Sequence, residues 1–237
     1  MSVSTSSQTR TKVIYPDSDG QPMAENTLQF EWIVTIKEGI EAVFLDRPDV
    51  FVAGDLLWYP VEGDPKTRIA PDVLVAFGRP KGYRGSYKQW EEGGIPPQVV
   101  FEVLSPGNRF NEMLRKHRFY EMFGVEEYYL YNPDDVDLFG WLRRGGTLEE
   151  ISEIKGWTSP RLGVRFDLTE ETLMIIGPDG RPFLTYSELV QQRNRLEEQR
   201  DQLEQQRDQL EQQRDQESRR VERLAAQIRS LGAEPEA

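Results

Sequence analysis

Two carboxylates occupy segments whose neighbours are mostly apolar, and a lysine follows them. Glu102 lies within the run VVFEVLSP (99–106), Asp72 begins the run DVLVAF (72–77), and Lys116 follows in a helical segment. A lone buried carboxylate is costly, so it needs a counter-charge, a proton or a metal ion. Two carboxylates at one end of a sheet repel each other, and a divalent cation relieves that repulsion. Two acids, a metal and a lysine could together hydrolyse a phosphodiester, because the metal polarises a phosphoryl oxygen and activates water.

Each of these residues taken alone also has an ordinary structural interpretation. Asp72 follows a proline, which is typical of a turn or a strand edge. Glu102 could pair with a basic side chain, and Lys116 could be a solvated helix residue. Ser105 lacks the G-x-S-x-G pattern of an activated serine, so we interpret it as a strand-end residue. His117 is interpreted as a surface or hydrogen-bonded histidine rather than a catalyst.

The composition restricts the chemistry further. The 237 residues contain no cysteine and one histidine. Disulfides, iron–sulfur clusters, cysteine zinc sites, multi-histidine metal sites and a thiol nucleophile are therefore excluded. Any metal must be held by oxygen ligands, which favours magnesium, manganese or calcium. The lack of cysteine fits a cytoplasmic location, and no apolar run approaches the ~20 residues of a membrane span.

The charge distribution bears on the partners. The net charge is −12, and residues 1–190 hold 20 basic and 30 acidic side chains, whereas residues 191–237 hold 9 and 11. An acidic body argues against generic tight DNA binding, which normally uses a basic surface. One loop, RPKGYRGSYKQW (79–90), interleaves aromatic residues with basic ones, as would suit phosphate contacts and base stacking, or it is an ordinary solvated loop. Its basic residues are Arg79, Lys81, Arg84 and Lys88.

Periodicity predicts a mixed α/β or α+β domain with a central sheet. Helices are expected at 24–46 and at 108–124, the second capped by Asn108 and ended by Gly124, and a short helix at 87–91. Strands are expected at 50–60, 71–78, 98–106, 125–133, 136–144, 162–168 and 172–177.

The C-terminal segment has a heptad repeat. Leu189, Leu196, Leu203 and Leu210 fall seven residues apart, and the unit DQLEQQR recurs. The spacing favours a self-associating coiled-coil helix and a homo-oligomer, with a dimer as the simplest form, although arginines at the a positions weaken it. A single solvated helix held by Glu/Arg pairs is the alternative. The expected organisation is a tail (1–22), a globular domain (23–186), a coiled-coil helix (187–232) and a short tail (233–237).

The order of these motifs resembles the Uma-type family of restriction-endonuclease-like proteins, a branch of the PD-(D/E)XK nuclease superfamily. The resemblance is carried by PDVLVAF (71–77), VVFEVLSPGNR (99–109), the helical Lys116 with Tyr120 four residues later, and GVEEYYLYNP (124–133). It implies a restriction-endonuclease-like mixed sheet flanked by helices, with a magnesium or manganese site at the sheet edge.

The resemblance also implies roles for individual residues. Asp72 and Glu102 match the metal-binding acids. The superfamily's lysine normally stands two residues after the glutamate, where this chain has Leu104, and Lys116 on the next helix matches the displaced lysine. A first-helix glutamate would be Glu25 or Glu31. Asp55 is a further candidate ligand.

We therefore expect a magnesium-dependent DNA endonuclease. A non-catalytic, nuclease-like scaffold that assembles through its coiled coil is the alternative, and the acidic surface favours it. A small-molecule hydrolase that uses the same carboxylates has no distinctive signal in the sequence.

Overall fold

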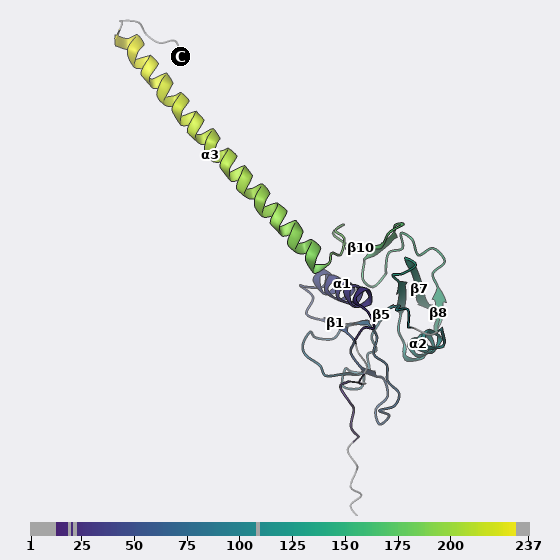
Figure 1. Cartoon of the computed structure of the whole chain (residues 1–237). Helices are drawn as coiled ribbons and strands as arrows, with labels where there is room; N and C mark the ends of the chain where they lie inside the picture. The colour runs from purple at the N-terminus through teal and green to yellow at the C-terminus, as the bar shows by residue number, and fades with distance from the viewer. Residues whose placement is uncertain (1–12, 19, 21–22, 108–109, 231–237) are drawn as a thin grey trace, which may run out of the picture. The chain divides into compact units, whose positions relative to one another are not determined.

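The computed structural model describes residues 13–18, 20, 23–107 and 110–230, and the chain forms two units, 1–185 and 186–237. The first unit is an α/β body and the second is a long helix (Figure 1). The helices of the body are α1 (Thr27–Val43) and α2 (Phe110–Phe123). Its strands are β1 (Val50–Gly54), β2 (Trp58–Tyr59), β3 (Val73–Phe77), β4 (Tyr87–Lys88), β5 (Val99–Val103), β6 (Glu127–Asn132), β7 (Asp137–Arg144), β8 (Thr147–Glu150), β9 (Arg165–Leu168) and β10 (Leu173–Ile176).

A six-stranded sheet in the order β1-β3-β5-β6-β7-β8 forms the centre of the body. The neighbouring strands β5 and β6 are parallel, and the other pairs are antiparallel, so the sheet is mixed. A parallel pair requires a crossover connection, which α2 provides between β5 and β6. The expected fold class, a mixed sheet flanked by helices, is confirmed.

The sheet has a hydrophobic core on each face. Alternation along β5 sends Val99, Phe101 and Val103 into one core, which also contains Ile36 and Ile40 of α1 and residues of the β9–β10 hairpin. Val100 points to the other core, which contains Tyr120 of α2 and Tyr128 of β6. Glu102 has the same parity as Val100, so its side chain lies on the α2 face of the sheet.

The local structure departs from the sequence predictions in three places. The strand expected at 50–60 is broken, because Asp55 adopts a positive φ of 47° and separates β1 from β2. A short helix was expected at 87–91, but its first two residues form strand β4, which pairs in parallel with β2. Strand β8 was not expected, because only Leu148 of its four residues is buried, which leaves a weak apolar signal.

The ends of the helices follow local chemistry. Asn26 caps α1 by accepting a 2.8 Å hydrogen bond from the backbone N–H of Gln29. After α2, Gly124 has a φ of +94°, a conformation that glycine adopts without strain, and it ends the helix as expected. The predicted cap Asn108 lies outside the described residues.

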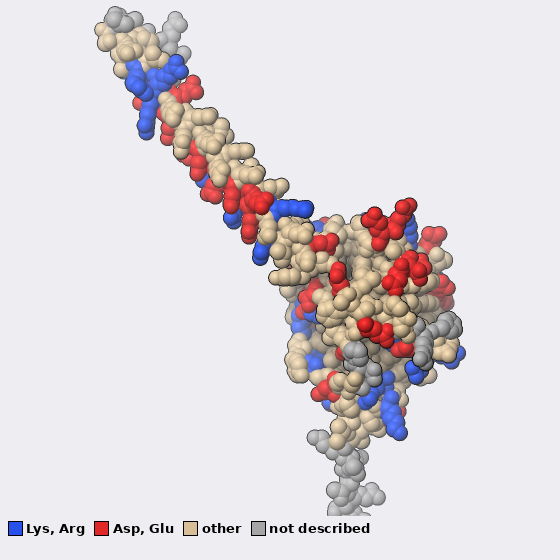
Figure 2. Space-filling model, viewed as in Figure 1, with Lys and Arg blue, Asp and Glu red and all other residues tan. Residues whose placement is uncertain are grey.

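The second unit contains the 45-residue helix α3 (Tyr186–Ser230), in which no residue is buried. The four regularly spaced leucines from Leu189 to Leu210 are each more than half exposed. Basic and acidic side chains alternate along its surface (Figure 2), and several form pairs within the helix, such as Arg207 with Glu204. Self-association through this helix stays a prediction. Within the described residues, no helix is long and apolar enough to cross a membrane.

Candidate active site

The register of β3 and β5 brings the two predicted acids together. These strands are antiparallel with Val73 opposite Phe101, and one further step along the ladder sets Asp72 opposite Glu102. Directly opposed residues of an antiparallel pair project to the same face, which here is the face covered by α2. The two carboxylates, which have 29 residues between them in the sequence, are therefore neighbours at one end of the sheet.

Asp72 is fixed by backbone groups on both sides. Its Oδ2 accepts a 2.7 Å hydrogen bond from the N–H of Val103 on β5, and its carbonyl oxygen accepts a 3.1 Å bond from the N–H of Asp55 after β1. The residue is 9% exposed. The backbone of Asp55 is thus brought beside Asp72, and the role of Asp55 as a ligand stays a prediction.

Glu102 is the more deeply buried acid, at 2% exposure, and α2 supplies its partners. Lys116 Nζ donates a 2.7 Å hydrogen bond to Glu102 Oε2, and the hydroxyl of Tyr120 donates to Oε1. Residues four apart lie on one helix face, so Lys116 and Tyr120 reach the same carboxylate from successive turns. The buried charge therefore has both a counter-ion and a hydrogen-bond donor in the protein.

Burial and neighbouring charge shift the pKa values of this group. Burial, followed by the charge of Glu102, raises the pKa of Asp72 well above its usual value. Burial lowers the pKa of Lys116, but the charges of Glu102 and Asp72 outweigh it, and the net pKa is raised. Burial and Glu102 raise the pKa of Tyr120. Lys116 is therefore an ammonium and Tyr120 a neutral hydroxyl at physiological pH.

The segment before α1 closes one side of the site. Gln29 Nε2 donates a 2.9 Å hydrogen bond to the carbonyl oxygen of Val103, and the N–H of Glu25 donates a 2.8 Å bond to Gln29 Oε1. The Ser105 hydroxyl donates to the Glu25 carboxylate. Of the two candidate first-helix glutamates, Glu25 thus lies at the site, whereas Glu31 is exposed on α1 and does not line the cavity.

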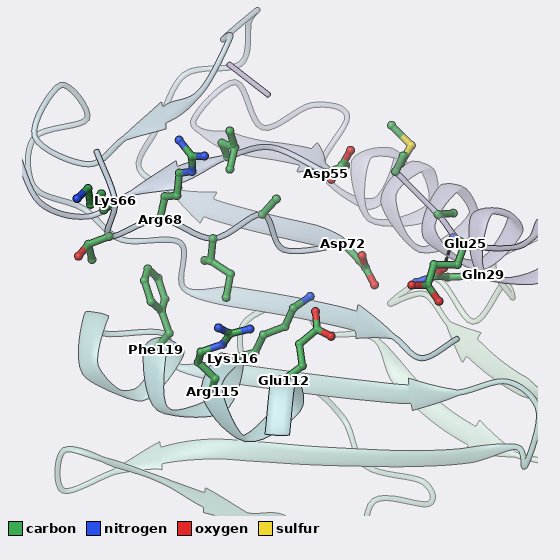
Figure 3. Close-up of a pocket in the computed structure, with 16 residues that line it drawn as sticks. Glu25, Gln29, Asp55, Lys66, Arg68, Asp72, Glu112, Arg115, Lys116 and Phe119 are labelled. Atoms are coloured by element: carbon green, nitrogen blue, oxygen red, sulfur yellow. Dashed lines mark hydrogen bonds between the residues drawn. The ribbon is translucent and has the colours of Figure 1, made fainter. Parts of the chain in front are cut away.

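A cavity of about 690 Å³ opens over this group (Figure 3). Glu25, Asp55 and Asp72 lie at one end of the view, and we call these three residues the acidic end. Glu102 is buried beneath the surface and is linked to the cavity by Lys116. The lining residues are Met23, Ala24, Glu25, Gln29, Asp55, Leu57, Lys66, Thr67, Arg68, Ile69, Ala70, Asp72, Glu112, Arg115, Lys116 and Phe119.

Sequence reasoning missed part of this cavity. Tyr120 was used as a motif residue and not as a partner of Glu102, although its spacing from Lys116 was a usable signal. No pattern in the sequence connects Lys66 and Arg68 with α2. Tertiary structure alone brings these cations, with Arg115, to the cavity.

The basic residues of the 79–90 loop do not line the cavity. Arg84 forms a two-pronged pair with Glu92, at 2.6 and 3.1 Å, and stacks on the Phe51 ring. Arg79 lies 3.9 Å from Glu92, and Lys88 lies 3.5 Å from Glu91. Lys81 donates to the Leu45 carbonyl oxygen at 3.4 Å. Three of the four cations are thus paired with acids.

His117 lies on α2 away from the carboxylates. Its ring packs against those of Tyr128 and Trp141, at centroid distances of 6.0 and 5.2 Å. Burial lowers the pKa of His117, which favours the neutral ring. The histidine therefore contributes to packing between α2 and the sheet.

The carboxylates of the site can be compared with the ligands that a divalent cation needs. Within the described part of the chain, no three histidine, aspartate or glutamate side chains are grouped closely enough to hold a metal by themselves. Magnesium, however, is commonly held by one or two carboxylates, with water and substrate phosphates as the remaining ligands. Asp72 and Glu102 are adjacent, and burial, followed by the charge of Glu102, raises the pKa of Asp72. The residues present fit a divalent cation.

The mixed sheet, its flanking helices and the acidic pair with its lysine at the sheet edge define an α/β domain of the restriction-endonuclease-like class. The chain belongs to the Uma2 family, described as "Putative restriction endonuclease", whose profile matches residues 18–173. This description places the chain among nucleases. A solved structure of a putative nuclease from Anabaena variabilis is similar, with 16% sequence identity, a TM-score of 0.45, and coverage of 58% of this chain and 75% of that one. No curated protein matched the chain.

Proposed function

We propose that this protein is a magnesium- or manganese-dependent DNA endonuclease whose active site consists of Asp72, Glu102 and Lys116. The observation that carries the proposal is their convergence: opposed positions on β3 and β5 place the two acids together, and Lys116 reaches them from α2. Family membership supports nuclease chemistry.

Asp72 and Glu102 would hold the cation, with Asp55 and Glu25 close enough in the cavity to orient bound water. A cation bound there would polarise the phosphoryl oxygen and lower the pKa of a bound water molecule. Each carboxylate oxygen has two lone pairs, so Glu102 can keep its protein donors while it binds a ligand.

Lys116 serves in this proposal as a fixed positive charge. Burial lowers its pKa, but the charges of Glu102 and Asp72 outweigh burial and raise it, and we assign Lys116 no proton transfer. It is suited to stabilise negative charge on the phosphoryl group, because charge aimed at the developing anion in a buried site is effective. Tyr120 holds Glu102 in position for the cation.

Metal-dependent cleavage is the test. Purified protein should cut DNA with magnesium or manganese at low salt, where an acidic protein binds DNA best. Asp72→Asn and Glu102→Gln should abolish cleavage and weaken metal binding. Lys116→Ala should keep metal affinity, since ammonium is no ligand, and slow cleavage by about 10²-fold or more. Lys81→Ala, which removes a cation outside the cavity, is the matched control.

One observation favours the second candidate, a non-catalytic scaffold. Both oxygens of Glu102 already have donors in the protein, so its charge is offset without a metal. The same assay separates the two functions. A protein that binds magnesium normally and cuts no DNA in these conditions would be a scaffold. DNA cleavage lost only in the acid variants would establish the nuclease.

A further inference from the structure

The cavity over the acidic end is electrically polarised. Lys66 and Arg68 line it at the opposite end of the view from Asp55 and Asp72 (Figure 3). Arg115 lines it from α2, where a fourth lining acid, Glu112, also among the described residues, stands three residues earlier without forming an ion pair with it. We call Lys66, Arg68 and Arg115 the basic wall. Within the described part of the chain, none of them forms an ion pair with an acid, unlike Arg79, Arg84 and Lys88.

Unpaired cations gathered in one cavity are unusual in a body whose net charge is negative. Such a protein has many carboxylates with which to pair its basic side chains. Like charges on one wall also repel each other, which an anionic ligand would relieve. The basic wall therefore has the positive charge that an anionic ligand requires. Arg68 Nη1 donates a 3.4 Å hydrogen bond to the Tyr59 hydroxyl, and its guanidinium has four further N–H groups.

The loop that presents Lys66 and Arg68 is well anchored. Trp58 and Ile69 exchange two backbone hydrogen bonds of 2.7 and 3.2 Å, which clamps the end of the loop to β2. The Asp64 carboxylate accepts from the backbone N–H groups of Lys66 and Thr67, at 3.0 and 3.3 Å, and from the Thr67 hydroxyl. The backbone that carries the two cations is thus held in place, which reduces the entropic cost of binding a ligand there.

Helix α2 supplies the rest of the wall. Arg115 precedes Lys116, and Phe119 lies one turn further along, with both Arg115 and Phe119 in the lining. The Phe119 ring packs edge-to-face on Trp58, at a centroid distance of 5.4 Å, so it is held in a fixed orientation. An aromatic ring among unpaired cations fits a ligand that carries phosphates and planar bases.

We propose that the basic wall and Phe119 form the binding site for the nucleic-acid strand, with Lys66, Arg68 and Arg115 on its phosphates and Phe119 against a base. The inference rests on the proposed nuclease function and adds the residues that hold the substrate. It assigns strand binding to this wall in place of the 79–90 loop, because three of the loop's four cations already have acidic partners.

Binding can be measured separately from cleavage. The full-length protein is titrated against a labelled single-stranded oligonucleotide in EDTA by fluorescence anisotropy, over a range of salt concentrations. Each phosphate contact contributes about 0.7–0.9 to the slope of log affinity against log salt. Lys66→Ala and Arg115→Ala should each lower the slope by about that amount and weaken binding about tenfold at about 0.1 M salt. Both residues are exposed, and thermal melts confirm folding.

Lys81→Ala and Arg79→Ala are the matched controls for charge, and both should bind as the parent does. Phe119→Leu keeps an apolar group against Trp58 and should weaken binding of the normal oligonucleotide several-fold. It should leave binding of an abasic oligonucleotide of equal length unchanged, because the abasic strand has phosphates and no bases to stack.

The outcomes separate the two proposals. Binding that depends on the wall with no cleavage in magnesium would refute the nuclease function and leave the strand site standing. Cleavage with unchanged affinity in Lys66→Ala and Arg115→Ala would overturn the strand site and keep the nuclease. Loss of binding in Lys81→Ala or Arg79→Ala, and not in the wall variants, would move the site to the loop. Undetectable binding of the oligonucleotide by the parent protein at low salt would also overturn the proposed strand site.

Discussion

Lys116 and Glu102 form an ion pair of 2.7 Å in which the lysine side chain is 16% exposed and the glutamate side chain 2%. The pair joins the middle of α2 to the C-terminal part of β5. In such a buried pair, the cost of removing the ions from water is comparable to their attraction. Loss of one partner is therefore far more destabilising than loss of both.

The first prediction follows from this asymmetry. Lys116→Met leaves Glu102 charged and buried, with the Tyr120 hydroxyl still donating to it, and should lower the free energy of unfolding by about 3–5 kcal/mol. The double variant Lys116→Met/Glu102→Gln should recover most of that loss, because no buried charge remains. Urea unfolding followed by circular dichroism measures both. A double variant no more stable than the single one would contradict this account of the pair.

The second prediction compares two tyrosines. The Tyr120 hydroxyl donates to Glu102, whereas the Tyr128 hydroxyl is buried without a hydrogen-bond partner among the described residues. Tyr120→Phe should therefore cost about 1–3 kcal/mol, because it removes a bond to a charged group. Tyr128→Phe should be neutral or stabilising, since it removes an unsatisfied polar atom. Equal losses in the two variants, measured by chemical unfolding, would count against the Tyr120–Glu102 bond.

The third prediction concerns pH. Because the pKa of Asp72 is raised in the folded state, its protonated form stabilises the fold at low pH, and this contribution is lost as pH rises from about 3.9 through the folded pKa. Asp72→Asn cannot ionise and keeps an oxygen to accept from Val103. In EDTA, the variant should therefore gain in Tm relative to the parent between pH 4 and neutral pH.

Magnesium provides the control for this pH series. The cation should raise the Tm of the parent at neutral pH, since it binds the ionised pair of the folded state, and should have little effect on Asp72→Asn. A Tm difference that is independent of pH would show that Asp72 ionises in the folded state as easily as in the unfolded one.

The fourth prediction tests assembly. A protein that ends at Thr185 should stay folded, because both hydrophobic cores consist of residues from the body. If α3 joins the chains, the shortened protein should contain fewer chains per particle than the full-length protein. Light scattering measures the mass of each particle, which is divided by the mass of one chain. Leu203→Ala/Leu210→Ala should reduce the mass of the full-length protein as well. Gln205→Ala/Gln212→Ala, on the outer helix face, is the matched control. A full-length protein that is already a monomer would refute the coiled coil.

Local patterns in the sequence were sufficient for most of the architecture. Apolar runs bounded by proline and glycine placed β3 and β5, and the 3.6-residue period placed α1 and α2, because burial of one face imposes its period on the sequence. The same patterns selected Asp72 and Glu102, since a carboxylate inside an apolar run is conspicuous. The heptads located α3 in the same way.

Tertiary structure decided what no local pattern encodes. The register between β3 and β5 set Asp72 opposite Glu102, and the crossover of α2 carried Lys116 to them, because strand pairing depends on contacts between distant segments. The tertiary structure also placed Glu25, and not Glu31, at the cavity, and it brought the basic wall there. Exposed charged residues follow no sequence period from which their neighbours in space could be predicted. Only the folded chain therefore shows which of its many charged residues face the site.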